Sequence, residues 1–152
     1  MPLDPSFIGR TYPPTAPYEV GREKIREFAD AVGDANPAYT DLDAAKALGH
    51  PDVIAPPTFP FVITYRAAAQ VVNDPELGLD FSRVVHGDQK FSYTRPVRAG
   101  DRLTVGVTID SIKSLAGNDV LTVRGEVRDE SGEHVVTSFM TLVARAADEA
   151  GE

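Results

Sequence analysis

The chain of 152 residues contains no cysteine. This absence excludes a disulfide framework, a zinc site built on thiolates and a cysteine nucleophile. Histidine is scarce as well, because His50, His86 and His134 are the only three and they stand far apart, with no clustered carboxylates beside them. We therefore predict that the protein holds no metal ion and needs no cofactor.

Long hydrophobic runs are also missing. The longest apolar stretch, residues 59–72, includes Arg66 and is shorter than the roughly 20 residues that cross a bilayer. The first residues, from Met1 to Pro5, lack the charged and apolar regions of a secretory signal. These features predict a soluble cytoplasmic protein without a membrane partner.

Positive charge is in deficit, since the formal net charge is −8. Nucleic-acid binding is therefore not expected, because contacts to phosphates supply most of that affinity. Residues 83–102 depart from this balance: five basic and two acidic side chains give them +3, against −11 for the remainder. The segment is either an ordinary solvated strand face or a local basic rim for an acidic or phosphorylated carrier.

The length suits one domain, which we place at residues 1–146, with a disordered tail at 147–152. The proline-rich start of the chain is a further candidate for disorder. Apolar spacing predicts an amphipathic helix over residues 22–32, ended by Gly33, and a short helix over 41–48. A third helix, apolar on nearly every face and therefore expected to be buried all round, follows Pro57 with Thr58 as its N-cap.

After Phe81, apolar residues recur at every second position instead of with helical spacing. Alternating apolar residues predict strands at 91–93, 103–109, 120–127 and 135–144, after a short one at 18–20, with tight turns at 117–118 and 131–132. Consecutive strands joined by tight turns form an antiparallel sheet. The pattern predicts an α+β domain, with such a sheet beside one apolar helix.

Two stretches resemble the MaoC-like hydratase/dehydratase family. Residues 28–39 (FADAVGDANPAY) are similar to the family signature Gly-Asp-x-Asn-Pro-x-His. Residues 53–57 (VIAPP) follow, and Pro56-Pro57 occupy the place of the His-Gly that opens the family's central helix. Residues 85–101 (VHGDQKFSYTRPVRAGD) resemble the strand and turn of the FAS1-like dehydratase branch. The resemblance covers roughly residues 18–145 and implies a hot-dog fold, in which the curved sheet wraps around the central helix.

In active members of the family, the aspartate and histidine act through one water. They hydrate a 2-enoyl thioester, or dehydrate a (3R)-3-hydroxyacyl thioester. Histidine accepts a proton near neutral pH, and a helix-terminal amide stabilises the charge that develops on the thioester oxygen. The resemblance makes an acyl-CoA or an acyl carrier protein thioester the expected ligand.

This sequence departs from the signature at two positions. Tyr39 stands in the place of the histidine, and a phenol with an ordinary pKa near 10 is a poor base at pH 7. Pro57 stands in the place of the glycine and has no amide hydrogen. Asp34 and Asn36 are retained. They are either site residues or residues whose side chains hydrogen-bond the local backbone of a turn. We expect this copy of the site to be idle.

The remaining candidates are substrate contacts. His86 opens the strand motif and is either a structural residue or a replacement base, whereas Thr58, Arg95 and Arg98, with Asn36 and Pro57, are candidate binding residues. The turn that contains the two arginines has a structural role, and its contact with a carrier phosphate is a hypothesis.

Three functions stay open. The first is a non-catalytic, tunnel-forming subunit of a heterodimeric (3R)-hydroxyacyl-ACP dehydratase or enoyl-thioester hydratase, acting in fatty acid metabolism with a catalytic hot-dog partner. The second is a self-sufficient hydratase that uses Asp34 with Tyr39 or His86. The third is a non-enzymatic protein that binds acyl thioesters. A hetero- or homodimer is expected in each case.

Overall fold

The computed structural model describes residues 2–145, so the tail expected at 147–152 lies outside the described residues. The helices are α1 (Arg22–Val32), α2 (Leu42–Ala47) and α3 (Phe61–Val72), with short 3₁₀ turns at Pro5–Phe7, Pro37–Tyr39 and Phe81–Arg83. The strands are β1 (Thr11–Tyr12), β2 (Tyr18–Glu19), β3 (Val84–Tyr93), β4 (Arg102–Leu115), β5 (Asn118–Arg128) and β6 (His134–Ala144). No helix within residues 2–145 is long and apolar enough to cross a membrane.

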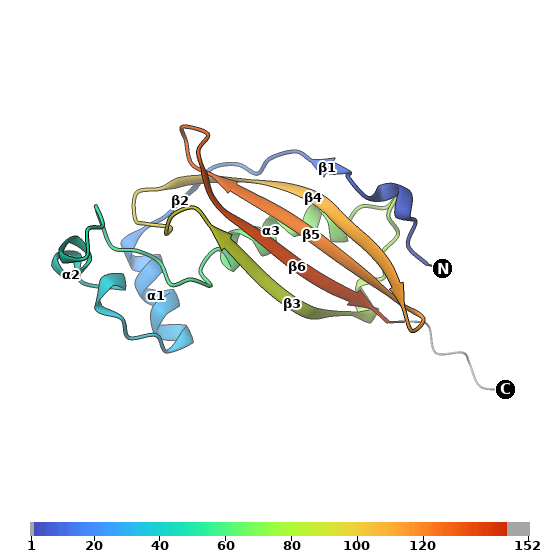
Figure 1. The fold of residues 1–152 in the computed structure, drawn as a ribbon, viewed down its shortest axis with the longest axis horizontal. Helices are drawn as coiled ribbons and strands as arrows, with labels where there is room; N and C mark the ends of the chain where they lie inside the picture. Colours follow the sequence, from blue (N-terminus) through green and yellow to red (C-terminus); the bar gives the residue numbers. More distant parts are fainter. Residues whose placement is uncertain (1, 146–152) are drawn as a thin grey trace.

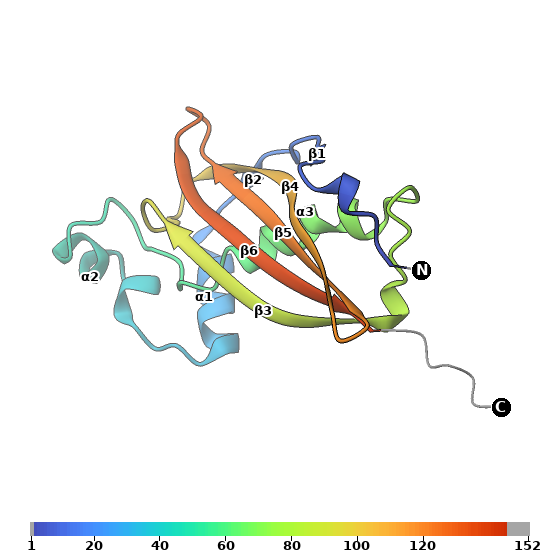
Figure 2. The ribbon, with the colours of Figure 1, turned by 45° about the vertical axis from the view of Figure 1, so that its right-hand side comes forward.

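All strand pairs are antiparallel. The order is β1-β4-β5-β6-β3, and β2 pairs with another part of β4. Figures 1 and 2 show α3 lying along one face of the curved sheet, while α1 and α2 lie beyond one end of it. This is the predicted α+β, hot-dog arrangement of a long helix with an antiparallel sheet curved over it.

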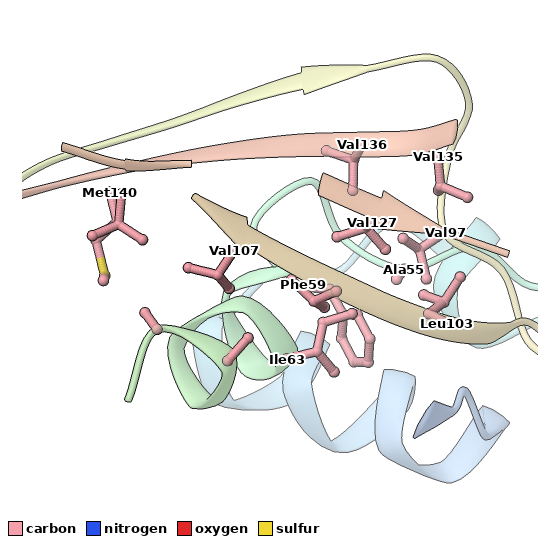
Figure 3. Close-up of a cluster of buried hydrophobic side chains, with 14 of the residues drawn as sticks. Ala55, Phe59, Ile63, Val97, Leu103, Val107, Val127, Val135, Val136 and Met140 are labelled. Carbon is pink, nitrogen blue, oxygen red and sulfur yellow. The ribbon is translucent and has the colours of Figure 1, made fainter. Parts of the chain in front are cut away.

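The core lies between α3 and the inner face of the sheet. Ile63, Ala67 and Val71 of the helix are buried against alternate strand residues such as Val107 and Val127, and Figure 3 shows this cluster. A Cβ on Gly125 of β5 would lie 3.5 Å from Thr64 Cγ2, an ordinary van der Waals distance, so α3 packs directly over this strand. The helix is therefore held on one side by a continuous apolar surface.

The expectation that α3 is buried all round was wrong. Tyr65, Arg66 and Ala69 are exposed, because the sheet of one chain curves over one side of the helix only. β3 is an edge strand of the sheet, because it pairs with β6 on one side and with no strand on the other side among the described residues. Tyr65 and Ala69 of the helix line a pocket together with Met140 and Leu142 of β6, the neighbour of β3, so the exposed helix face borders this side of the sheet.

The proline-rich start is ordered, contrary to expectation. Arg10 Nη1 and the Tyr12 hydroxyl donate to Asp74 Oδ2 at 2.9 and 2.7 Å, and the Leu3 amide donates to Asp119 Oδ2 at 3.0 Å. These contacts join residues more than sixty positions apart, so composition near the N-terminus gave no sign of them. They hold the first residues along the β4 side of the sheet.

Candidate functional site

The turn after α1 positions two retained signature residues. Gly33 adopts φ 74°, the left-handed conformation that glycine adopts without strain, and ends the helix as predicted. Asp34 Oδ1 then accepts from the Asn36 amide at 3.3 Å, and Asn36 Oδ1 accepts from the Ala38 amide at 3.0 Å. Both side chains therefore bond the local backbone, as the turn alternative predicts.

Asp34 has a second partner. The Tyr39 hydroxyl donates to Asp34 Oδ2 at 3.1 Å, and the Tyr39 side chain is buried. Burial, and then the hydrogen bond to Asp34, raises the pKa of Tyr39 above its ordinary value. The phenol therefore stays protonated at neutral pH and acts as a donor, which is the opposite of what a general base must do.

The segment before α3 differs in detail from the prediction. Pro60, and not Thr58, precedes the first helical residue as the N-cap, so the assignment of Thr58 was wrong. The amides of Phe59 and Phe61 are taken by the carbonyl oxygens of Pro56 and Thr58, at 2.9 and 3.1 Å. Two consecutive turns thus precede the helix and delay its start. Thr58 itself is exposed.

Tyr93 completes this region, although sequence reasoning did not select it. Its hydroxyl donates to the Pro57 carbonyl oxygen at 2.6 Å across 36 positions of sequence, and burial raises its pKa. A pocket of about 270 Å³ lies here, with walls that include Tyr39, Ile54, Pro57, Tyr93 and Arg95. The one available signal was the alternation that places Tyr93 on the same face of β3 as Phe91.

The two arginines of the motif do not form a free basic rim. Arg95 donates to both carboxylate oxygens of Asp101 at 2.9 and 3.0 Å and to Asp129 at 3.2 Å, and its side chain is largely buried. Arg98 lies 4.0 Å from the same Asp101 carboxylate. These contacts support the structural role of the turn, and contact with a carrier phosphate stays a prediction.

His86 makes no hydrogen bond to Asp34 or Tyr39 and is not part of the pocket beside Tyr39. Seven positions of β3 separate it from Tyr93, which corresponds to roughly 23 Å at 3.3 Å per residue. It hydrogen-bonds instead to Gln89, with 3.1 Å between His86 Nε2 and Gln89 Oε1. The structure thus brings Asp34, Asn36, Tyr39 and Pro57 into one region, but leaves His86 in another.

Comparisons with known proteins agree with this architecture. Residues 6–138 match the family model described as FAS1-like, dehydratase domain region. The chain belongs to this family. A UPF0336 protein of Streptomyces coelicolor is 78% identical to the FAS1-like domain over 150 residues, which cover 99% of this chain and all of that protein.

Solved structures extend the comparison. A MaoC-like dehydratase superposes with a TM-score of 0.88 at 37% identity, covering 95% of the FAS1-like domain, which spans only 44% of that longer protein. The HadBC (3R)-hydroxyacyl-ACP dehydratase complex of Mycobacterium tuberculosis contains a chain with a TM-score of 0.81 at 32% identity, covering 90% of this chain and 96% of that one. The predicted family and fold are therefore confirmed.

Proposed function

We propose that this FAS1-like domain is a non-catalytic subunit of an (R)-specific enoyl-thioester hydratase or (3R)-hydroxyacyl-ACP dehydratase of cytoplasmic fatty acid metabolism. The observation that carries the proposal is the hydrogen bond from Tyr39 to Asp34. The site holds a protonated phenol where a proton acceptor is required, and its carboxylate is already engaged. Water addition therefore needs an acceptor from elsewhere.

Pro57 supports the same conclusion. It has no amide hydrogen to stabilise a thioester oxygen, and its carbonyl oxygen is held by Tyr93. Removing one oxyanion donor slows acyl-transfer enzymes by roughly 10² to 10³. Two independent losses together favour a chain that binds and shapes the acyl site while a second chain performs the chemistry.

The open side of the molecule supports a partner. The β3 edge and the adjacent exposed face of α3 form a surface that a second hot-dog chain would cover, and the similar HadBC protein is itself a complex of two subunits. A partner with an intact Gly-Asp-x-Asn-Pro-x-His signature would supply the aspartate and histidine. The acyl thioester would then be bound between the two chains.

The test is the hydration of a short 2-enoyl-CoA by the purified chain, alone and co-expressed with a hot-dog chain that carries an intact Gly-Asp-x-Asn-Pro-x-His signature. We expect turnover only in the presence of the partner. Turnover by the isolated chain that disappears in Asp34→Asn or His86→Ala would show a self-sufficient hydratase instead. Tight acyl-CoA binding without turnover, with or without a partner, would show a binding protein.

A further inference from the structure

β3 is an edge strand with one open side. Among the described residues it pairs with β6 alone, and Figures 1 and 2 show it as the outermost strand of the sheet. The backbone N–H and C=O groups on its open side can pair with the edge strand of another chain. The side chains of β3 therefore decide which strand fits there, and in which register.

A β-bulge shortens the ladder of β3 by one residue. The register shifts between His86 and Asp88, and Gly87 between them pairs with no residue of β6. The ladder with β6 therefore uses nine residues of β3, and Gln89 is the fifth of these nine. With the bulge residue left out, successive ladder positions alternate between the inner and the outer face of the sheet.

Contacts within the chain identify the two faces. Gln89 lies on the inner face, because its Nε2 donates at 2.7 Å to Ser138, which is 2% exposed. Lys90 lies on the outer face, where its Nζ is 5.6 Å from the centre of the Phe139 ring, and Asp88 shares this face. Asp88 and Lys90 are both exposed, and neither forms an ion pair within residues 2–145. The open edge thus carries one acid and one base, on either side of Gln89.

This arrangement makes β3 complementary to itself. In an antiparallel pair of identical strands, opposed residues share a face, so the twofold axis passes through one ladder position. An axis at Gln89 sets Asp88 of each copy opposite Lys90 of the other copy, which gives two ion pairs. The same axis uses the whole strand, because Gln89 is the middle one of the nine ladder positions.

The other residues of β3 fit the same register. With the axis at Gln89, Val84 lies opposite Tyr93 of the second copy, and His86 lies opposite Phe91. All four of these side chains belong to the inner face. Pairs of an aromatic side chain with a β-branched or a second aromatic side chain stabilise antiparallel sheets.

Neighbouring registers lack these features. An axis at Asp88 or at Lys90 sets two like charges directly opposite each other, which is unfavourable. An axis at Phe91 leaves both charged side chains without an opposite charge, and it pairs only residues 89–93 of β3 with one another.

We infer that β3 binds the β3 strand of a second copy of this chain, with the twofold axis at Gln89, and that Asp88 and Lys90 select this register. One continuous antiparallel sheet then runs through both copies. The catalytic partner of the proposed function uses the same edge, so it has to displace the second copy. An acidic residue two positions before a basic one on its own edge strand gives it the same fit. The inference rests on β3 and not on the proposed function.

The test measures the dissociation constant of self-association of the purified chain by sedimentation equilibrium. Asp88→Lys and Lys90→Asp each set like charges opposite each other twice, so each variant alone should associate at least about tenfold more weakly than the wild type. An equimolar mixture of the two variants should recover the wild-type affinity, because one supplies two bases and the other supplies two acids. Lys113→Asp, on β4, is the matched control and should associate like the wild type.

The exchanged variant, Asp88→Lys with Lys90→Asp, separates the register from the net charge. It should associate with itself like the wild type, because opposite charges again face each other. It should not pair with the wild type, because every facing pair is then of like charge. Native mass spectrometry of the exchanged variant, mixed with isotopically labelled wild type, measures the amount of the mixed pair.

Three results would overturn the inference: a wild type that stays monomeric up to its solubility limit, a mixture of the two single variants that associates no better than either variant alone, or an exchanged variant that pairs freely with the wild type. Partner-dependent hydration is measured separately and does not depend on these outcomes. Failure of the inference is therefore distinguishable from failure of the proposed function.

Discussion

Tyr39 and Tyr93 place two phenol groups beside the segment that leads into α3. Burial raises the pKa of each, and the Asp34 carboxylate adds to the effect at Tyr39. Both hydroxyls are donors at neutral pH, and both are used: one holds Asp34, the other holds the Pro57 carbonyl oxygen. Side chains of this kind fix the shape of the pocket but accept no proton.

Restoring both the histidine base and the amide hydrogen of the oxyanion donor should therefore restore hydration of an enoyl thioester. Restoring one of them alone should not. Tyr39→His supplies a base without an oxyanion donor, and we expect its rate of 2-butenoyl-CoA hydration to stay near background. Tyr39→His with Pro57→Gly should exceed the single variant by about 10²-fold, since an amide hydrogen then becomes available. The absorbance of the enoyl group measures both rates.

Adding Asp34→Asn to the double variant is the control and should return it to background. A single Tyr39→His variant as fast as the double variant would contradict the role assigned to Pro57.

At this scale the sequence predicted part of the site. The signature places Asp34, Asn36, Tyr39 and Pro57 within one continuous stretch, and Tyr39 bonds Asp34 and lines a pocket with Pro57. Their roles as site residues stay a prediction. Tyr93 was missed because its contact with Pro57 depends on how β3 passes that stretch, which spacing does not encode. The register of β3 shifts between His86 and Asp88, which the alternation of residues does not reveal.

At the scale of the secondary-structure elements, a cluster of ion pairs links the loops that connect the strands. Arg95 and Asp101 lie in the connection between β3 and β4, and Asp129 lies in the β5–β6 turn, so one guanidinium links two connections. The side chains of Arg95, Asp101 and Asp129 are 19%, 7% and 15% exposed. Because these three side chains are largely buried, removing one of them leaves the charges of the others without a full counter-charge.

Arg95→Met should consequently lower the free energy of unfolding by about 2 to 3 kcal/mol, as expected for a broken, largely buried pair. Arg98→Met is the matched control, because Arg98 is more exposed and lies 4.0 Å from Asp101. Its loss should cost less than about 1 kcal/mol. Urea unfolding followed by circular dichroism measures both, and equal losses would argue against the cluster.

Asp129 also predicts a dependence on pH. Hydrogen bonds from Ser131, and then from Glu133 and Arg95, lower the pKa of Asp129 to about 2. A carboxylate whose pKa is lower in the folded state stabilises it above the unfolded value of about 3.9, and this contribution is lost as pH falls toward 2. Asp129→Asn should flatten the decrease in unfolding free energy between about pH 4 and pH 2.

The exposed neighbour Glu130 provides the comparison for this experiment, since Glu130→Gln should leave the slope between pH 4 and pH 2 as in the wild type. Denaturant titrations at a series of pH values give the slopes. A wild-type slope in Asp129→Asn would show that this carboxylate contributes little.

The elements themselves were largely predictable. Residue periodicity located α1, α2, α3, β4, β5 and β6, since each buries one face that its own residues specify. It found only residues 91–93 of β3, because no residue of that strand is fully buried. Three further details were not predictable: the order in the first residues, the start of α3 and its exposed face. Each depends on what lies beside the segment in space, namely the β4 edge, the turns before the helix and the limited width of the sheet.

At the scale of the whole molecule, the two edges of the sheet differ in whether other segments of the chain pair with them. The β4 edge is paired with β1 and β2, and Thr15 adds a side-chain bond to the Val105 amide at 3.0 Å. The β3 edge carries Val85, which is 47% exposed, and Phe81 and Tyr65 are exposed as well. An apolar strand edge of this kind favours pairing with another chain.

Val85→Lys should therefore weaken association with the hot-dog partner at least tenfold, because a charge would be buried at the junction. Ile8→Lys is the matched control: Ile8 is 45% exposed and precedes Gly9, whose amide bonds Ile109 on the opposite side of the sheet. Its affinity for the partner should be unchanged. Size-exclusion chromatography with light scattering measures both, and equal effects would place the interface elsewhere.

The short N-terminal strand β1 has a consequence for assembly. Its two residues, with those of β2, occupy hydrogen-bonding positions of β4 that would otherwise be available to another sheet. A sheet with two free edges can add chains at both ends and grow into a filament, whereas a sheet with one free edge is finished after a single addition. Removal of residues 2–12 should uncover the part of β4 that pairs with β1, and we expect the variant to form larger assemblies than the proposed pair.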